Sequence, residues 1–189
     1  DYDKKIEMLY SSYSISEMYN FPLRSEQHQK ALNFLDGIIE NRITYNVLEI
    51  GSNRGDFLYL LKEKYPKINL IGCEPTEFKD LLIPTVNAFF NANLFNTKFD
   101  LIILRHTLEH IKYPKKFIRE LQSIMRQGSR LFIEVPNVVY SLNNFIEDFT
   151  PDHVSYFSKN TLIKTCNELN LLKADDKDYL YAVFELSSY

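Results

Sequence analysis

Glycine is scarce in this chain of 189 residues: it occurs five times, where a usual frequency of roughly 7% would give about 13. Each glycine position is therefore informative. Only two cysteines are present, Cys73 and Cys166, which are too few for a disulfide scaffold and favour a reducing compartment. No stretch approaches the roughly 18 consecutive apolar residues of a membrane-spanning helix, and the sequence shows no signal-peptide pattern. We therefore expect a cytoplasmic protein that does not interact with a membrane.

An excess of positive charge is also lacking. Lys and Arg number 22 and Asp and Glu 25, so the formal net charge is −3. Proteins that bind nucleic acids usually carry a basic footprint, and the short basic run at Lys112, Lys115 and Lys116 is interpreted as a solvated helix start. We therefore expect no nucleic-acid partner. The length and the 45% hydrophobic content fit one compact domain with a substantial core.

Short apolar runs alternate with amphipathic segments along most of the chain, which predicts a parallel sheet with helices on both faces. Strands are expected at 47–50, 68–71, 86–90, 100–104 and 131–135, and a hairpin at 171–186. Helices are expected from residue 25, at 56–64, 76–83 and 115–126, and from residue 158. Residues 1–44 form a helical lead that could close over a ligand as a lid, and residues 45–189 form the core, with an irregular insert at 137–157.

The end of the first strand carries two of the five glycines, Gly51 and Gly55, around a tight turn into a helix. Such glycines let the backbone approach a ligand closely. A dinucleotide-binding turn would read G-x-G-x-x-G, but Asn53 and Asp56 occupy its second and third glycine positions. Asp56 and Glu49 would also repel a pyrophosphate at the helix N-terminus. An acidic strand end suits S-adenosylmethionine better, since that cofactor has a cationic sulfonium and ammonium and no phosphate.

The second strand ends in Glu74 and Pro75. An acidic residue about 20 residues beyond the glycine turn is placed to accept hydrogen bonds from ribose hydroxyls. A charge at a helix N-terminus is the alternative interpretation of Glu74.

Four segments together resemble class I S-adenosylmethionine-dependent methyltransferases. They are 47–55 (VLEIGSNRG), 71–75 (IGCEP), 99–111 (FDLIILRHTLEHI) and 131–137 (LFIEVPN). The resemblance covers about residues 45–186 and implies a Rossmann-like, doubly wound, mostly parallel seven-stranded sheet that ends in an antiparallel hairpin. The segment 153–158 (HVSYFS) resembles sugar-nucleotide C-methyltransferases, whereas the LEHI sequence is equally similar to ubiquinone-biosynthesis-type O-methyltransferases.

The resemblance also implies a set of cofactor-binding residues. The methionine part of the cofactor is expected to contact Glu49, Gly51, Ser52, Asn53 and Gly55, and the ribose to contact Glu74 and Pro75. The adenine is expected to contact Asn91, Ala92 and Asn93. At the end of the fourth strand, the cofactor is expected to meet Leu104 and Arg105. S-adenosylhomocysteine would be the product.

Histidines supply the candidates for a catalytic base. His153 is the first candidate, with Tyr156 beside it, and His106 at the end of the fourth strand is the second. His106 and His110 have the i, i+4 spacing of half a zinc site, but no HExxH motif or cysteine cluster accompanies them, so no metal site is predicted.

The sequence thus predicts a methyltransferase acting on a small-molecule acceptor, a sugar or a sugar-nucleotide-related metabolite. A non-catalytic S-adenosylmethionine-binding subunit and a nucleotide-dependent oxidoreductase are the alternatives, and a homodimer is left open.

Overall fold

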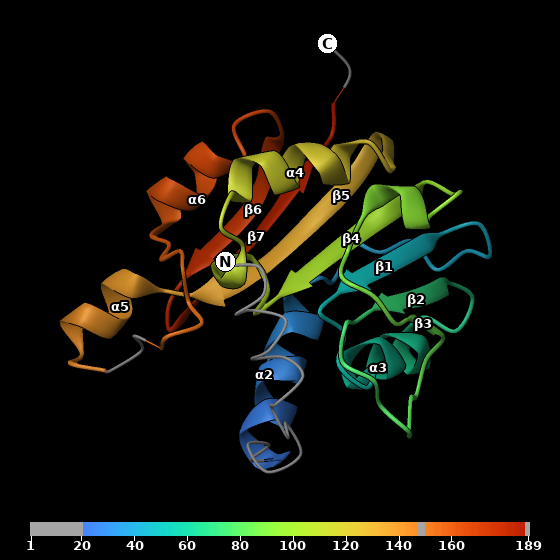
Figure 1. Cartoon of the computed structure of the whole chain (residues 1–189), viewed down its shortest axis with the longest axis horizontal. Coiled ribbons are helices and arrows are strands. Elements are labelled where there is room, and N and C mark those ends of the chain that lie inside the picture. The colour runs from blue at the N-terminus through green and yellow to red at the C-terminus, as the bar shows by residue number, and fades with distance from the viewer. Residues whose placement is uncertain (1–20, 147–149, 188–189) are drawn as a thin grey trace.

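The computed structural model describes residues 21–146 and 150–187. Its elements in chain order are α2 (Phe21–Phe34), β1 (Asn46–Ile50), α3 (Asp56–Lys64), β2 (Asn69–Cys73), β3 (Thr85–Val86), η2 (Ala92–Leu94), β4 (Phe99–Arg105), η3 (Leu108–His110), α4 (Pro114–Gln122), β5 (Met125–Pro136), α5 (Val138–Asn143), α6 (Lys159–Thr165), β6 (Asn170–Asp176) and β7 (Tyr179–Glu185). They form one seven-stranded sheet flanked by helices (Figure 1).

The strand order is β3-β2-β1-β4-β5-β7-β6. Strands β1 to β5 pair in parallel, β7 is antiparallel to β5, and β6 and β7 form the terminal antiparallel hairpin. This confirms the predicted Rossmann-like, mostly parallel sheet. The order reverses between β1 and β4, so the carboxyl ends of these two strands mark the place where a doubly wound fold binds ligands.

The central strands are apolar on both sides because helices bury both faces. Successive side chains of each strand point to opposite faces of the sheet. Val47 and Leu101 belong to the hydrophobic cluster that includes residues of α2 and α3, whereas Leu48 and Ile102 belong to the cluster that includes residues of α4 and α6. All four side chains are fully buried. The two layers hold the sheet firmly and leave its carboxyl edge for the site.

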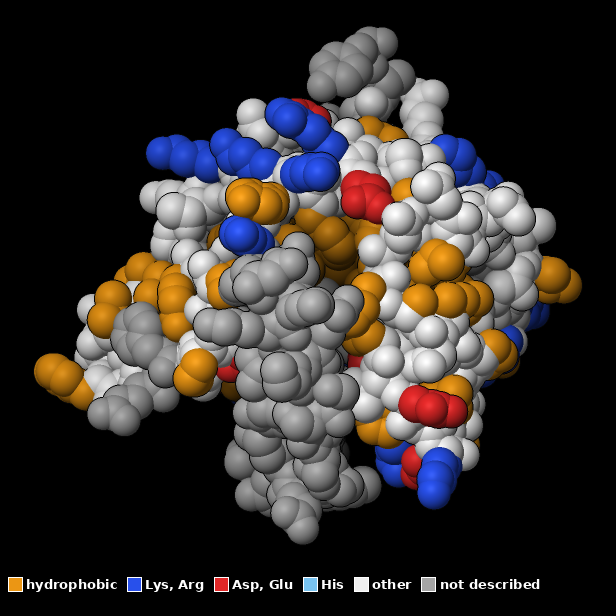
Figure 2. Space-filling view, viewed as in Figure 1, with side chains coloured by type: hydrophobic (Ala, Val, Ile, Leu, Met, Phe, Trp, Pro, Cys, Tyr) orange, Lys and Arg blue, Asp and Glu red, His pale blue; other side chains and the backbone are white. Residues whose placement is uncertain are grey.

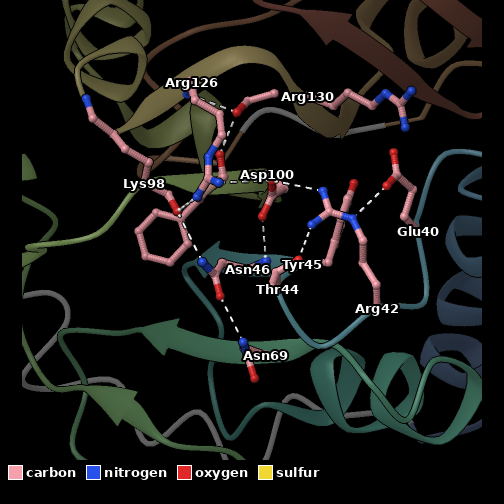
Figure 3. Close-up of polar contacts among 12 residues, drawn as sticks. Glu40, Arg42, Thr44, Tyr45, Asn46, Asn69, Lys98, Asp100, Arg126 and Arg130 are labelled. Carbon is pink, nitrogen blue, oxygen red and sulfur yellow. Dashed lines mark hydrogen bonds and ion pairs between the residues drawn. The ribbon is translucent and has the colours of Figure 1, made fainter.

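The amino edge of the sheet is closed by a polar network around Asp100 (Figure 3). The Asp100 carboxylate accepts a hydrogen bond from the backbone N–H of Asn46 at 2.7 Å and lies 3.6 Å from Arg42 and 3.7 Å from Arg126. The Asn69 side chain donates to the Asn46 side chain at 3.0 Å. These contacts tie β1, β2 and β4 together at the end opposite the site, and we interpret them as structural.

The predicted helix at 76–83 is wrong, since this segment is made of bends and irregular backbone. Its backbone donors find partners elsewhere: the N–H of Thr76 donates to the Glu74 carboxylate, and that of Leu82 donates to the carbonyl of Arg54. Because these hydrogen bonds take the place of helical ones, the segment forms no helix. The third strand is likewise only Thr85–Val86 instead of 86–90.

Three further boundaries differ from the prediction. Helix α2 begins at Phe21, with Pro22 in its first turn, where a proline is tolerated. Helix α4 ends at Gln122, and β5 already begins at Met125, with Gly128 inside the strand at a φ of 78°. The insert contains a short helix, α5, because the Asn137 side chain accepts hydrogen bonds from the first-turn N–H groups.

The predicted division at residue 44 remains a prediction, and the part of the predicted lid before residue 21 lies outside the described residues. The rest of that lead is not separate from the core, since Ala31 and Leu32 of α2, and Leu35 just after it, pack against the sheet. Both cysteines are buried free thiols. No helix among the residues described is long and apolar enough to span a membrane.

Candidate functional site

The turn after β1 uses the left-handed backbone region three times. Gly51 has a φ of 76°, Asn53 of 50° and Gly55 of 90°. Glycine enters this region without strain, and asparagine enters it more readily than other residues do. Asn53 can therefore stand where a dinucleotide-binding turn has its second glycine, which explains the departure from that motif.

The glycines also allow close packing inside the protein. A Cβ at Gly51 would lie 2.4 Å from Oγ1 of Thr107, and one at Gly72 would lie 2.3 Å from Oγ of Ser52. Both distances are far below van der Waals contact. At Gly51 and Gly72 the backbone therefore lies too close to its neighbours to leave room for a side chain.

Glu74 lies where the ends of β1 and β2 meet. Its side chain is buried, with Oε2 accepting from the N–H of Asn53 at 3.0 Å and Oε1 accepting from the N–H of Thr76 at 2.9 Å. A carboxylate oxygen accepts more than one hydrogen bond, so both oxygens retain capacity for further donors. Asn87 donates to the carbonyls of Glu74 and Pro75 and fixes this corner.

Glu49 is a buried carboxylate at the reversal point of the strand order. Its Oε2 is buried and has no hydrogen-bond partner among the described residues. Burial raises the pKa of Glu49 to about 8, the carboxylates of Glu134 and Glu74 raise it further, and Arg105 opposes them. A buried carboxylate without a donor is unfavourable, so this position fits a cationic ligand group. Ser52 adds a second buried polar atom without a partner, its Oγ.

Arg105 forms a buried ion pair at the end of β4. Its Nε donates to Oε2 of Glu134 at 2.5 Å, its guanidinium lies 4.2 Å from the Phe57 ring centre, and Glu134 has no exposed surface. Burial raises the pKa of Glu134, but the charges of Arg105 and His106 outweigh it and hold that pKa at about 2. The Arg105 side chain therefore stabilises the end of β4 by pairing with Glu134 and packing on Phe57. The neighbouring Leu104 is fully buried in β4.

His106 continues this network, with an unusual φ of 50°. Its Nε2 lies 3.3 Å from Glu134 and 2.7 Å from the side-chain nitrogen of Gln27, and its Nδ1 lies 3.4 Å from Glu109. Burial lowers the pKa of His106, but the two carboxylates outweigh it and raise that pKa to about 9. His106 is thus held at the end of β4 by two carboxylates and Gln27, and its role as a base stays a prediction.

His153 lies against η3 instead of standing alone in an irregular insert. Its ring packs edge-on against His110, with ring centres 4.9 Å apart, and lies 6.1 Å from the ring of Tyr156. The Tyr156 hydroxyl donates to the carbonyl of Thr150 at 3.4 Å. The sequence gives no sign that Glu109 and His110 would join His153, because the two segments are brought together only by the fold.

The segment expected to contact adenine forms the 3₁₀ helix η2. Asn91 caps it by accepting from the N–H of Asn93 at 2.9 Å, and the N–H of Ala92 donates to the Glu120 carboxylate of α4 at 3.0 Å. These contacts hold the segment to α4. Whether it contacts adenine stays a prediction.

The family is settled by comparison with known proteins. Residues 21–172 match the model of a family described as "Methyltransferase domain". The chain belongs to this family. It also resembles the solved 1,6-didemethyltoxoflavin-N1-methyltransferase of Burkholderia thailandensis, determined with 1,6-didemethyltoxoflavin and S-adenosylhomocysteine bound. The TM-score is 0.74 at 12% identity, covering 99% of this chain and 89% of that one, which shows the shared fold.

The chain is therefore a class I S-adenosylmethionine-dependent methyltransferase, as predicted, with S-adenosylmethionine as its cofactor. Neither the oxidoreductase nor the non-catalytic alternative is retained.

Curated relatives give a different indication about the acceptor. The tRNA U34 carboxymethyltransferase of Campylobacter fetus is 28% identical over 100 residues, covering 47% of this chain and 35% of that protein. That of Campylobacter concisus is 23% identical over 147 residues, covering 62% and 50%. The chain thus spans half or less of the length of these relatives.

These relatives contradict the expected partners, a small-molecule acceptor and no nucleic acid, because their names give a tRNA as substrate. The prediction was wrong because it used the net charge of the whole chain. A net charge averages over the surface and conceals local basic patches, which are what contact phosphates.

Proposed function

We propose that this methyltransferase transfers a one-carbon group from S-adenosylmethionine to a tRNA. The observation that carries the proposal, beside the curated relatives, is a basic and aromatic groove at the start of α4. Lys112, Tyr113, Lys115, Lys116 and Arg119 line this groove, whose volume is about 660 Å³. We call it the α4 groove.

The α4 groove has the chemistry that RNA requires. Its lysines are exposed, and Tyr113 is 63% exposed with the Lys112 ammonium 5.3 Å from its ring centre. Figure 2 shows Lys and Arg side chains gathered over α4. Ammonium groups bind phosphates, and an exposed aromatic ring offers a surface on which a base can stack. Because η3 connects β4 to α4, the groove lies close to the strand ends that we assign to the cofactor.

Electrostatics at the strand ends supports the cofactor placement. Bound S-adenosylmethionine supplies an electrophilic methyl group on a sulfonium sulfur. Glu49 would face its cationic methionine part, and Glu74 would accept from the ribose hydroxyls. His106 and the Arg105–Glu134 pair would hold the end of β4 in place. Positioning of donor and acceptor is then the main contribution of this site.

The basic groove gives a direct test of the acceptor. Lys115→Glu/Lys116→Glu should weaken tRNA binding at least about tenfold at physiological salt and reduce the salt dependence, because each lost phosphate contact removes about one unit of the log–log slope. The matched control is Lys67→Glu/Lys79→Glu, which changes the net charge equally at exposed positions away from α4. Fluorescence anisotropy with labelled tRNA measures both. Equal weakening by the two variants would contradict the assignment.

Binding of S-adenosylhomocysteine should depend on pH through Glu49. With a pKa of about 8, Glu49 is mostly neutral at pH 6.5 in the free protein, and the ionised form is the one that attracts a cation. Affinity should therefore fall about 15-fold from pH 8.0 to 6.5. Glu49→Gln should bind more weakly at pH 8.0 and lose most of this dependence, whereas Glu77→Gln, at an exposed position, should keep it. Calorimetry at several pH values measures the affinity. If Glu49→Gln keeps the pH dependence of the wild type, Glu49 is not the group that causes it.

A further inference from the structure

Three potential metal ligands come together on η3 and the segment before α6. One donor atom each of Glu109, His110 and His153 lies within 4.8 Å of the other two. Glu109 is 1% exposed and the two histidines are partly buried. This trio is separate from the carboxylates assigned above to the cofactor, and we call it the Glu109 trio.

The Glu109 carboxylate lacks the donors that a buried charge needs. Neither oxygen accepts a hydrogen bond from a described residue. Oε1 lies 3.4 Å from Nδ1 of His106, which is an ion-pair distance without hydrogen-bond geometry. A carboxylate removed from water is costly unless it is paired and hydrogen-bonded, so a further cation would stabilise this arrangement.

Both histidines are arranged as metal-binding imidazoles often are. Nδ1 of His153 is buried without a hydrogen-bond partner among the described residues. Nδ1 of His110 lies 3.0 Å from the carbonyl oxygen of Asp152 and 3.6 Å from its carboxylate. A metal-bound imidazole usually donates its second N–H to such an oxygen, which fixes the tautomer and the ring orientation. Nε2 is then the nitrogen through which His110 would bind a cation.

Backbone hydrogen bonds hold the two segments in register. The N–H groups of Val154 and Ser155 both donate to the carbonyl of Glu109, at 2.9 and 3.0 Å, and the Ser155 hydroxyl donates to the carbonyl of Ile111 at 3.2 Å. His153 is thereby held beside η3 by main-chain contacts on its C-terminal side. The trio is preorganised and does not depend on a chance encounter of side chains.

We propose that Glu109, His110 and His153 form a binding site for a divalent transition-metal ion, with Zn²⁺ the best match. Two imidazoles and one carboxylate form a ligand set that suits zinc, whereas magnesium and calcium prefer oxygen ligands. Ligands around tetrahedral zinc lie about 3.3–3.6 Å apart for bonds of about 2.0–2.2 Å, so the trio needs to close by roughly an ångström. This site was not predicted from the sequence.

Three protein ligands leave a coordination position open, as in catalytic zinc sites. Glu109 and His110 follow the end of β4 directly, next to His106. The open position would therefore take water or an oxygen atom of a group bound at the carboxyl edge. Metal binding itself does not depend on the identity of the acceptor, so the inference holds or fails independently of the proposed function.

Metal titration of the full chain tests the site. After chelation and equilibrium dialysis against Zn²⁺, the wild type should retain about one ion per chain, and Co²⁺ in its place should give d–d absorption bands. Glu109→Gln and His153→Ala should each weaken Zn²⁺ binding more than the about 10–100-fold caused by losing an outer-shell partner. His28→Ala, which removes a histidine of α2 that packs near Phe57, should bind as the wild type does.

Circular dichroism and thermal unfolding establish that each variant folds, and Zn²⁺ should raise the melting temperature of the wild type and of His28→Ala only. If both ligand variants fail to fold, X-ray absorption of the wild type decides, and the inference requires two imidazoles and one carboxylate around the ion. Substoichiometric binding by the wild type, or unchanged binding by folded Glu109→Gln and His153→Ala, would overturn the inference.

Discussion

Replacing Glu74 with alanine should weaken S-adenosylhomocysteine binding at least about 100-fold, which corresponds to about 2.7 kcal/mol. The loss has two sources. Two charge-assisted hydrogen bonds to the ribose disappear, each worth about 1.5–3 kcal/mol. The N–H groups of Asn53 and Thr76, which now donate to this carboxylate, also lose their acceptor, so the turn after β1 is no longer held.

Calorimetry with S-adenosylhomocysteine measures the effect. Glu77→Ala is the matched control, because Glu77 is an exposed carboxylate of the same segment, and it should bind normally. Glu74→Gln keeps the shape and one acceptor and should fall between the wild type and Glu74→Ala. Thermal unfolding separates loss of the site from loss of the fold. A folded Glu74→Ala with nearly unchanged affinity would remove Glu74 from the cofactor site.

The second large effect concerns stability. Arg105→Met should lower the free energy of unfolding by about 3–5 kcal/mol, because it leaves the fully buried Glu134 carboxylate without its guanidinium partner. The double variant Arg105→Met/Glu134→Leu should recover most of that loss, since it removes both charges and leaves apolar side chains of similar size. Denaturant unfolding measures all three proteins.

An exposed ion pair supplies the comparison for this experiment. Arg119→Met breaks the surface pair with Glu168 and should unfold at nearly the wild-type denaturant concentration, since exposed pairs contribute little. Equal destabilisation by Arg105→Met and by the double variant would mean that the pair itself is not what stabilises this end of β4. The packing of Arg105 on Phe57 would then carry the effect.

Local pattern was sufficient to predict the central sheet. Leu48 and Leu101 lie in short apolar runs that can only be stable when both faces are covered, and the strands form there. The same reasoning failed for the segment between Glu74 and Thr85, where it predicted a helix. Its spacing suits a helix, but the N–H of Thr76 donates to the nearby Glu74 carboxylate and that of Leu82 donates to the carbonyl of Arg54. The contact with Arg54 joins segments distant in sequence, and no local pattern contains it.

The candidate site also contains residues that could be predicted from the sequence and residues that could not. Glu49 and Glu74 follow from strand ends and spacing, and the structure brings both to the carboxyl edge of the sheet. The raised pKa of His106 could not be predicted, because it depends on Glu134 of the neighbouring strand and on Glu109. The Glu109 trio was missed for a related reason, since His153 joins it from a segment distant in sequence.

The most direct measurement is the transfer of labelled methyl from S-adenosylmethionine to purified tRNA, followed by mass analysis of the nucleosides. The account predicts label in tRNA with the wild type and much less with the Lys115→Glu/Lys116→Glu variant and with Glu74→Ala. A wild-type protein that binds S-adenosylhomocysteine normally but never labels tRNA would contradict the proposed acceptor.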